Sequence, residues 1–138
     1  MEIEYSHQAP DMFALYNLYQ TTGWYLEKPI SQSEIARAVD NSQFKVSAYS
    51  EGPRLVGFGR VLTDGVIHAM IYEMIVEPRY QRRGIGKTIL KMLVDYCLEL
   101  KVRDIQLFCA RDRRGFYEKS GFAARPDDAP GMQYTGLH

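Results

Sequence analysis

The segment that most constrains this fold is an apolar run followed by a basic, glycine-containing turn and an amphipathic stretch. Apolar side chains run almost unbroken over residues 66–76, and Glu77-Pro78 closes the run. The turn at 81–87 reads QRRGIGK, and residues 85–100 have the spacing of an amphipathic helix. A buried strand therefore leads through the turn into a helix start, where backbone N–H groups and the positive end of a helix dipole meet. This arrangement suits a phosphate or pyrophosphate.

The order of charges along the same helix supports a bound anion. A polar stripe of residues four apart runs from two cations at the helix start to two anions at its end: Lys87, Lys91, Asp95 and Glu99. Each such charge opposes the helix dipole at a cost of about 0.3–1 kcal/mol. An anion at the helix start would turn the Lys87 penalty into a gain, and Arg79, Arg82 and Arg83 add positive charge. The alternative is a solvated basic turn whose glycines only permit tight packing.

Two better-known phosphate motifs do not fit this turn. A P-loop needs a glycine, four intervening residues and then Gly-Lys-Ser/Thr; Gly86-Lys87-Thr88 could be that block, but the position of the leading glycine, 81, is Gln. The dinucleotide fingerprint needs a third glycine after Gly84 and Gly86, but position 89 is Ile. The turn is therefore neither of these two sites.

Length and composition predict one globular domain over residues 1–138 in the cytoplasm. Hydrophobic residues make up 46% and charged residues 25% of the chain. We see neither a run near the roughly 20 apolar residues of a membrane span nor a signal peptide. Cys97 and Cys109 have no metal-binding spacing, and no metal site is predicted.

Charge is unevenly distributed although the net charge is zero. Residues 1–43 carry two Lys or Arg against six Asp or Glu, a balance of −4, whereas residues 79–125 carry twelve against five, a balance of +7. The asymmetry suggests two differently charged binding regions rather than one uniform surface. A nucleic-acid-binding module is disfavoured, because the cations cluster beside glycines at a helix start and the net charge is zero.

Hydrophobic periodicity and turn signals give the order β-α-α-β-β-β-α-β-α-β-β. Capping residues mark one helix start, since Ser31 and Glu34 form a capping-box pattern, and Asp64-Gly65 marks a hairpin. The order fits an α/β (α+β) domain with a mixed, mostly antiparallel sheet flanked by helices. The predicted strands are 2–6, 44–50, 54–62, 66–76, 105–109, a piece from 122 and 132–135, and the helices are 10–20, 31–39, 85–100 and 113–120.

Two separated motifs carry a resemblance to a known family. Residues 82–86 (RRGIG) are similar to the Arg/Gln-x-x-Gly-x-Gly/Ala signature of the GNAT superfamily of acyl-CoA-dependent N-acyltransferases, and 75–81 resembles the strand and loop before it. Residues 115–122 (GFYEKSGF) resemble the family's Phe-Tyr-x-Lys-x-Gly-Phe element. The predicted element order also agrees with this family across nearly the whole chain.

The resemblance implies acetyl-CoA as the acyl donor. The backbone at the end of the strand would hydrogen-bond the pantetheine arm, amides from residue 82 to 88 would hold the pyrophosphate, and Arg79 or Arg82 would reach the 3′-phosphate. The cofactor-binding residues implied in this way are Met74, Ile75, Val76, Arg79, Gln81, Arg82, Arg83, Gly84, Ile85, Gly86, Lys87, Thr88 and Tyr117.

The resemblance also suggests catalytic residues. Tyr117 stands where the family commonly places a general acid for the CoA thiolate, although its phenol can instead only position CoA. Glu73, an acid inside an apolar strand, is expected to share a face with Ile71 and Ile75. It can orient a water that takes the amine proton or bind a cationic amine. An equally open alternative is that Glu73 has no role in the reaction and is either paired with an arginine or pointing into solvent.

The acceptor side is the region that the family places between the first two helices. Trp24 and Tyr25 either line that cleft or pack against the sheet. The acidic excess of residues 1–43 favours a cationic acceptor, either a small-molecule amine or a peptide. Homodimers are frequent in the family, but no interface is evident here.

One departure from the family pattern bears on function. The family often has Asn at the junction before the tyrosine, whereas residues 109–114 read CARDRR. A ping-pong route through Cys109 is disfavoured, since no histidine lies near it in the sequence. The sequence thus predicts an N-acetyltransferase acting by direct attack in a ternary complex, and the alternative is a non-catalytic CoA-binding or sensor domain.

Overall fold

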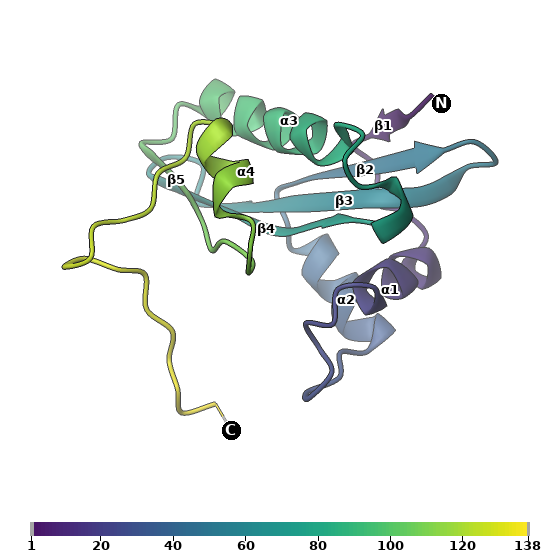
Figure 1. The fold of residues 1–138 in the computed structure, drawn as a ribbon, viewed down its shortest axis with the longest axis horizontal. Helices are drawn as coiled ribbons and strands as arrows, with labels where there is room; N and C mark the ends of the chain where they lie inside the picture. The colour runs from purple at the N-terminus through teal and green to yellow at the C-terminus, as the bar shows by residue number, and fades with distance from the viewer. Residues whose placement is uncertain (1, 138) are drawn as a thin grey trace. The chain divides into compact units, whose positions relative to one another are not determined.

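The computed structural model describes residues 2–137, which group into a larger unit ending at Leu107 and a smaller unit beginning at Phe108 (Figure 1). The larger unit contains, in chain order, β1 (Glu4–Ser6), α1 (Met12–Gln20), α2 (Gln32–Asp40), β2 (Phe44–Ser50), β3 (Arg54–Thr63), β4 (His68–Val76), the 3₁₀ helix η1 (Pro78–Tyr80), α3 (Ile85–Leu100) and β5 (Asp104–Leu107). The smaller unit contains α4 (Arg114–Lys119). None of the helices within residues 2–137 is long and apolar enough to cross a membrane.

The five strands form one sheet in the order β1-β2-β3-β4-β5. Neighbours from β1 to β4 are antiparallel, and β5 runs parallel to β4 because α3 carries the chain back between them. The predicted mixed, mostly antiparallel sheet is therefore confirmed. The helix ends are also encoded locally, since Ser31 and Glu34 exchange both capping-box hydrogen bonds at the start of α2.

Helices cover both faces of the sheet, with α1 and α2 on one side and α3 on the other (Figure 1). The central strand β3 is consequently buried on both faces, and its side chains alternate between the two helical layers. On the α1–α2 side, Phe58 and Ile75 pack in one cluster with Leu15 and Ile35. On the α3 side, glycines let the helix approach the strand closely.

Gly59 is one of these close contacts. A Cβ at Gly59 would lie 2.8 Å from Leu93 Cδ1 and 3.0 Å from Met74 Sδ. We predict that Gly59→Ala lowers the free energy of unfolding by about 1–3 kcal/mol, the usual cost of overpacking. Urea unfolding measures the change. Gly115→Ala in α4 is the matched control: its Cβ would meet nothing within 4 Å, so it should be neutral or slightly stabilising. Equal stability of wild type and Gly59→Ala would contradict the prediction.

The smaller unit corrects the predicted end of the chain. The strands expected from residue 122 and at 132–135 do not form within the described residues. A strand needs a hydrogen-bonded partner and a face to bury, whereas Met132 and Tyr134 are 85% and 73% exposed. Other element boundaries shift as well, those of β4 and β5 for example. β5 covers 104–107 rather than 105–109, and β4 begins at His68 because the Asp64 carboxylate accepts hydrogen bonds from the N–H groups of residues 66, 67 and 68.

Candidate active site

A β-bulge interrupts β4 in the middle of the predicted site. Phe58 pairs with Ile75 and Arg60 with Tyr72, so that Glu73 and Met74 together lie opposite the single residue Gly59. Glu73 has a left-handed backbone, with φ 51°. The extra residue changes the alternation of side chains, so that the expected face shared with Ile75 is confirmed and the one shared with Ile71 is wrong. Glu73 faces α1 like Ile75, whereas Ile71, paired with Val61, lies on the α3 side.

Past this bulge, β4 has an open edge. Pairing with β5 ends at Ile71–Leu107, and among the described residues no strand pairs with 72–76 on that side. Glu77 N–H donates to Val56 on β3 at 2.8 Å, and the alternation of backbone groups then directs those of Val76 and Met74 toward the open edge. Ile75 instead faces β3. Of the three predicted pantetheine contacts, Met74 and Val76 therefore have backbone groups on the correct side.

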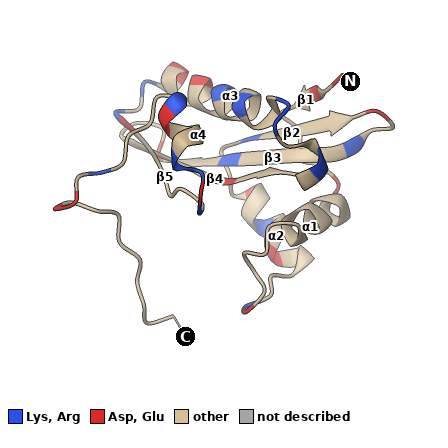
Figure 2. Ribbon diagram, viewed as in Figure 1, with Lys and Arg blue, Asp and Glu red and all other residues tan. Residues whose placement is uncertain are grey.

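The basic turn after η1 brings free backbone donors to the start of α3. Arg82 and Gly84 both have left-handed backbones, at φ 65° and 83°, and Gly84 is the N-cap without a side-chain cap. N–H groups from Gly84 to Lys87 have no intrahelical acceptor. Figure 2 shows the loop before α3 in blue, the colour of Lys and Arg. Thr88 differs, because its N–H already bonds Gly84 O at 3.1 Å and leaves no free backbone donor.

Two predicted side chains near the turn are already engaged in this structure. Gln81 Nε2 donates to Val76 O at 3.1 Å and ties the turn to the end of β4. Arg79 Nε donates to Glu77 Oε1 at 3.0 Å, whereas the buried Glu77 Oε2 has no hydrogen-bond partner among residues 2–137. Arg79 must therefore break its hydrogen bond with Glu77 before it can reach a phosphate. Arg82 forms no ion pair with another described residue and would not bear this cost.

Beneath the bulge lies a buried polar cluster, here called the Arg60 cluster: Arg60, Glu73, Tyr19, Tyr25 and Ser42. Arg60 Nε and Nη2 both donate to the Glu73 carboxylate, the latter at 3.1 Å to Oε1. Tyr19 Oη donates to Glu73 Oε2 at 2.7 Å, and Tyr25 Oη to Oε1 at 3.5 Å. Of the readings left open for Glu73, the structure thus shows the acid paired with an arginine.

The pKa values within the Arg60 cluster follow from burial and pairing. Burial lowers the pKa of Arg60, but the hydrogen bond and the charge of Glu73 outweigh it, so the net shift is upward. Burial and the nearby Glu73 charge raise the pKa of Tyr19 and of Tyr25. Both phenols therefore stay protonated at neutral pH and act as donors to the carboxylate.

Arg60 and Tyr19 were missed by the sequence reasoning. A signal for Arg60 was present, because a charged side chain inside the apolar strand 54–62 is the same anomaly that pointed to Glu73. Tyr19 gave no such signal, since a tyrosine at helical spacing is equally consistent with simple core packing. Of the predicted acceptor residues, Tyr25 joins the Arg60 cluster, whereas Trp24 is 45% exposed.

Tyr117 lies in the smaller unit. Its side chain is buried, and its ring meets Phe116 and Phe122 edge to face. Burial and the nearby Cys109 raise the pKa of Tyr117 to about 12, against a smaller lowering by Arg113. The phenol is thus protonated at neutral pH, as a proton donor must be.

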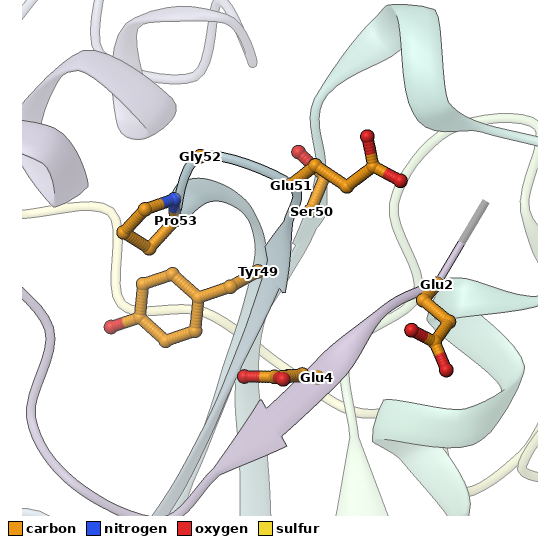
Figure 3. Close-up of a pocket in the computed structure, with 7 residues that line it drawn as sticks. All are labelled: Glu2, Glu4, Tyr49, Ser50, Glu51, Gly52 and Pro53. Carbon is orange, nitrogen blue, oxygen red and sulfur yellow. The ribbon is translucent and has the colours of Figure 1, made fainter.

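A separate pocket of about 330 Å³ lies at the β2–β3 turn and β1 (Figure 3). Three carboxylates, Glu2, Glu4 and Glu51, line it together with Tyr49 and Pro53. This acidic lining repels phosphate groups, so the pocket does not suit the predicted cofactor. No cluster of His, Cys, Asp and Glu able to hold a metal ion occurs among residues 2–137.

The fold and motifs match a family model directly. The model described as the acetyltransferase (GNAT) family matches residues 9–122, from before α1 to just past α4. The chain belongs to the GNAT acetyltransferase family. This membership makes it a GNAT-type N-acetyltransferase by class and explains the strand, basic turn and helix that meet at the open edge of β4.

Curated relatives agree on the family but differ in their acceptors. An uncharacterized N-acetyltransferase ycf52 from Porphyra purpurea is 30% identical over 88% of this chain and 70% of its own length. The histone acetyltransferase TAP1 of Glycine max is 31% identical over 93% of this chain and 58% of its own. Serotonin N-acetyltransferase 2, chloroplastic, of Oryza sativa subsp. japonica is 33% identical, with 90% and 62% covered.

Solved GNAT structures share the fold. A GNAT family acetyltransferase from Streptococcus pneumoniae superposes with a TM-score of 0.83 at 26% identity, covering 99% of this chain and 100% of that one. The PaiA N-acetyltransferase of Thermoplasma acidophilum, in complex with coenzyme A, has a TM-score of 0.74 at 19% identity, covering 91% and 92%. The second likeness supports the fold alone.

Proposed function

We propose that this GNAT protein transfers the acetyl group of acetyl-CoA to a primary amine by direct attack in a ternary complex. The observation that carries the proposal is the open edge of β4 leading into an uncapped, basic start of α3. Such an edge pairs with an amide-containing chain as another strand would, and the helix start binds a pyrophosphate. Pantetheine and pyrophosphate follow one another in CoA in the same order.

The residues fit this acyl donor in particular ways. The backbone of Met74 and Val76 would hold the pantetheine amides, and the N–H groups of residues 84–87 would hold the pyrophosphate. Acidic residues are absent from the first turn of α3, and a Cβ at Gly84 would meet nothing within 4 Å, so the approach to these donors is unobstructed. Arg82, Arg83 and Lys87 would neutralise the phosphate charge.

The chemistry requires a neutral amine, a carbonyl to attack and a proton for the leaving thiolate. We assign the proton donor to Tyr117 from the family motif and from its protonated, buried phenol. The nitrogen forms a bond to the acetyl carbonyl carbon and loses a proton to water, the carbon–sulfur bond breaks, and the phenol proton goes to sulfur. Water then returns a proton to the Tyr117 phenolate. Glu73 would bind the amine. Its action as a base stays a prediction, because it must first release one of its donors.

The acceptor class follows from the site and its relatives. A carboxylate beside two phenols recognises an amine better than a hydroxyl or a thiol, because an amine offers several N–H donors. Two relatives are named for a histone and for serotonin, the first acceptor being a protein and the second a small molecule. We therefore propose a primary amine on either kind of carrier, and retain the cytoplasmic location, the single domain over 1–138 and a homodimer as proposals.

A non-catalytic CoA-binding or sensor domain is the alternative, favoured by the lack of the family's Asn at residues 109–114. Release of CoA from acetyl-CoA in the presence of a panel of amines separates the two functions. Turnover with at least one primary amine supports the enzyme. Tight CoA binding without release of CoA from any amine in the panel would favour the sensor.

Neutralising the basic turn tests the donor site. The triple variant Arg82→Gln, Arg83→Gln, Lys87→Gln should weaken CoA binding by about 100-fold, at roughly 1 kcal/mol for each partly exposed charge contact. Calorimetric titration with CoA at low salt measures the affinity. The control triple variant Arg37→Gln, Lys101→Gln, Arg103→Gln removes the same charge from exposed positions elsewhere and should leave the affinity within a few-fold. Equal affinities of the two triple variants would remove the basic turn from the site.

A further inference from the structure

We propose that Arg60 is a positioning residue for the acceptor: through Glu73 and the Tyr25 hydroxyl, it anchors the loop of residues 21–30, here called the acceptor loop. The inference rests on the proposed function, since it assigns a task at the acceptor side of the same site. It concerns a residue that neither touches the basic turn nor lies in either family motif.

Two contacts besides Glu73, one with Ser42 and one with the Tyr72 ring, hold the Arg60 guanidinium in place. It lies within β3 at 9% exposure, and its Nη1 donates to Ser42 Oγ at 3.1 Å. Ser42 Oγ in turn donates to Ala38 O, in the last turns of α2, at 2.8 Å. The guanidinium also lies over the Tyr72 ring, 5.4 Å from its centroid. A planar group held in this way presents its Nε and Nη2 donors in one orientation.

The orientation of the guanidinium determines that of the Glu73 carboxylate. Arg60 donates to both carboxylate oxygens, one from Nε and the other from Nη2. Such a two-point contact fixes the plane of the carboxylate as well as its position. Glu73 has a left-handed backbone at the bulge, and its two oxygens have different phenol partners. Oε2 also accepts from buried Tyr19, whereas Oε1 faces half-buried Tyr25.

Tyr25 transmits this orientation to the acceptor loop. Its ring stacks on Tyr19 with centroids 5.9 Å apart, and its hydroxyl reaches Glu73 Oε1 at 3.5 Å, the longest contact of the carboxylate. Residues 21–30 contain neither helix nor strand and are mostly exposed, so side-chain anchors decide where the loop lies. An acceptor amine reaches Oε1 most easily by taking the place of this long contact. Arg60 thus sets both the loop position and the oxygen offered to the amine.

The chain contains an internal probe of the loop. Trp24, its one tryptophan, is the neighbour of Tyr25. In Arg60→Lys, a single ammonium cannot reproduce two parallel hydrogen bonds. We expect acrylamide to quench Trp24 emission at least twofold more strongly, acceptor kcat/KM to fall about 10-fold, and CoA affinity to stay within twofold. Tyr25→Phe, which leaves the ion pair intact, should raise quenching in the same way. Arg37→Lys, the same substitution at an exposed site on α2, should change none of these.

The outcomes separate the anchor from a merely structural role. A folded Arg60→Lys with wild-type quenching and acceptor kcat/KM would overturn the inference, whatever its melting temperature. If Arg60→Lys does not fold, Tyr25→Phe decides, and unchanged quenching in that variant overturns the inference as well. If the wild-type protein acetylates no amine, the proposed function fails, yet the quenching measurement still tests the anchor independently.

Discussion

Arg60→Met is expected to lower the free energy of unfolding by about 3–5 kcal/mol, the usual cost of removing one member of a buried ion pair. The side chains of Arg60 and Glu73 are only 10% and 12% exposed, so solvent cannot replace the lost cation. Glu73 would keep its two phenol donors but lose the countercharge. Urea unfolding of the wild type and the variant measures the change.

A double-mutant cycle tests whether the cost arises from the unpaired charge. Arg60→Met with Glu73→Met replaces both charges by apolar groups and should recover most of the loss, because a well-packed apolar pair often substitutes for a buried ion pair. Arg37→Met at an exposed position of α2 is the matched control and should change stability by less than about 0.5 kcal/mol. A double variant as unstable as the sum of its single variants would show that Arg60 and Glu73 are not energetically coupled.

Tyr117→Phe should reduce turnover by about 10²–10⁴-fold, the usual contribution of a general acid, with acetyl-CoA affinity nearly unchanged. Phenylalanine keeps the ring contacts with Phe116 and Phe122 and removes only the hydroxyl. Steady-state kinetics with calorimetric CoA binding separates the two effects. Tyr134→Phe, which removes a hydroxyl from a 73% exposed ring, should leave both unchanged. Wild-type turnover of Tyr117→Phe would end the assignment.

The pH dependence adds a second test of Tyr117. Because burial raises the pKa of Tyr117 to about 12, the phenol keeps its proton through neutral and mildly alkaline pH. Loss of the acid should therefore depress turnover only as pH nears 12. The raised pKa of Tyr117 also contributes to the stability of the fold, and this contribution, like turnover, falls at high pH. It is fully present below pH 10, the ordinary pKa of tyrosine, and is lost between 10 and 12 as the buried phenol ionises.

Local patterns predicted most elements closely. The β2 strand at 44–50 and the α3 helix at 85–100 have the predicted bounds, and the Ser31–Glu34 capping box forms. These features depend on residues within one or two turns of each other, and such neighbours are visible in a linear sequence. The strands expected after residue 121 show the limit. Extended, apolar-containing segments predict a strand only where a neighbouring strand completes the hydrogen bonds.

The basic turn was predicted in outline as a glycine-containing turn that opens a helix, but the free donors of its backbone were not all predicted. Gly84 and the basic side chains stand where the motif indicates, because the turn and helix start are encoded within a few residues. Which backbone and side-chain groups are free to bind could be read only from the tertiary structure. The Thr88 amide is used inside α3, Ile75 faces β3, and Arg79 pairs with Glu77. Each of these facts depends on hydrogen bonds that the residue type alone does not specify.

The sequence by itself determined the strand, basic turn and helix within residues 66–100, and with them the prediction of an anion site and the resemblance to GNAT acyltransferases. Its information there is local, since a dipole, a glycine turn and a row of cations need only consecutive residues. Only the tertiary structure decided the state of Glu73. The bulge turns it away from the face of Ile71, and its partners Arg60 and Tyr19 are 13 and 54 residues distant in the chain. Strand register and helix packing bring them together, and neither can be read from a single segment.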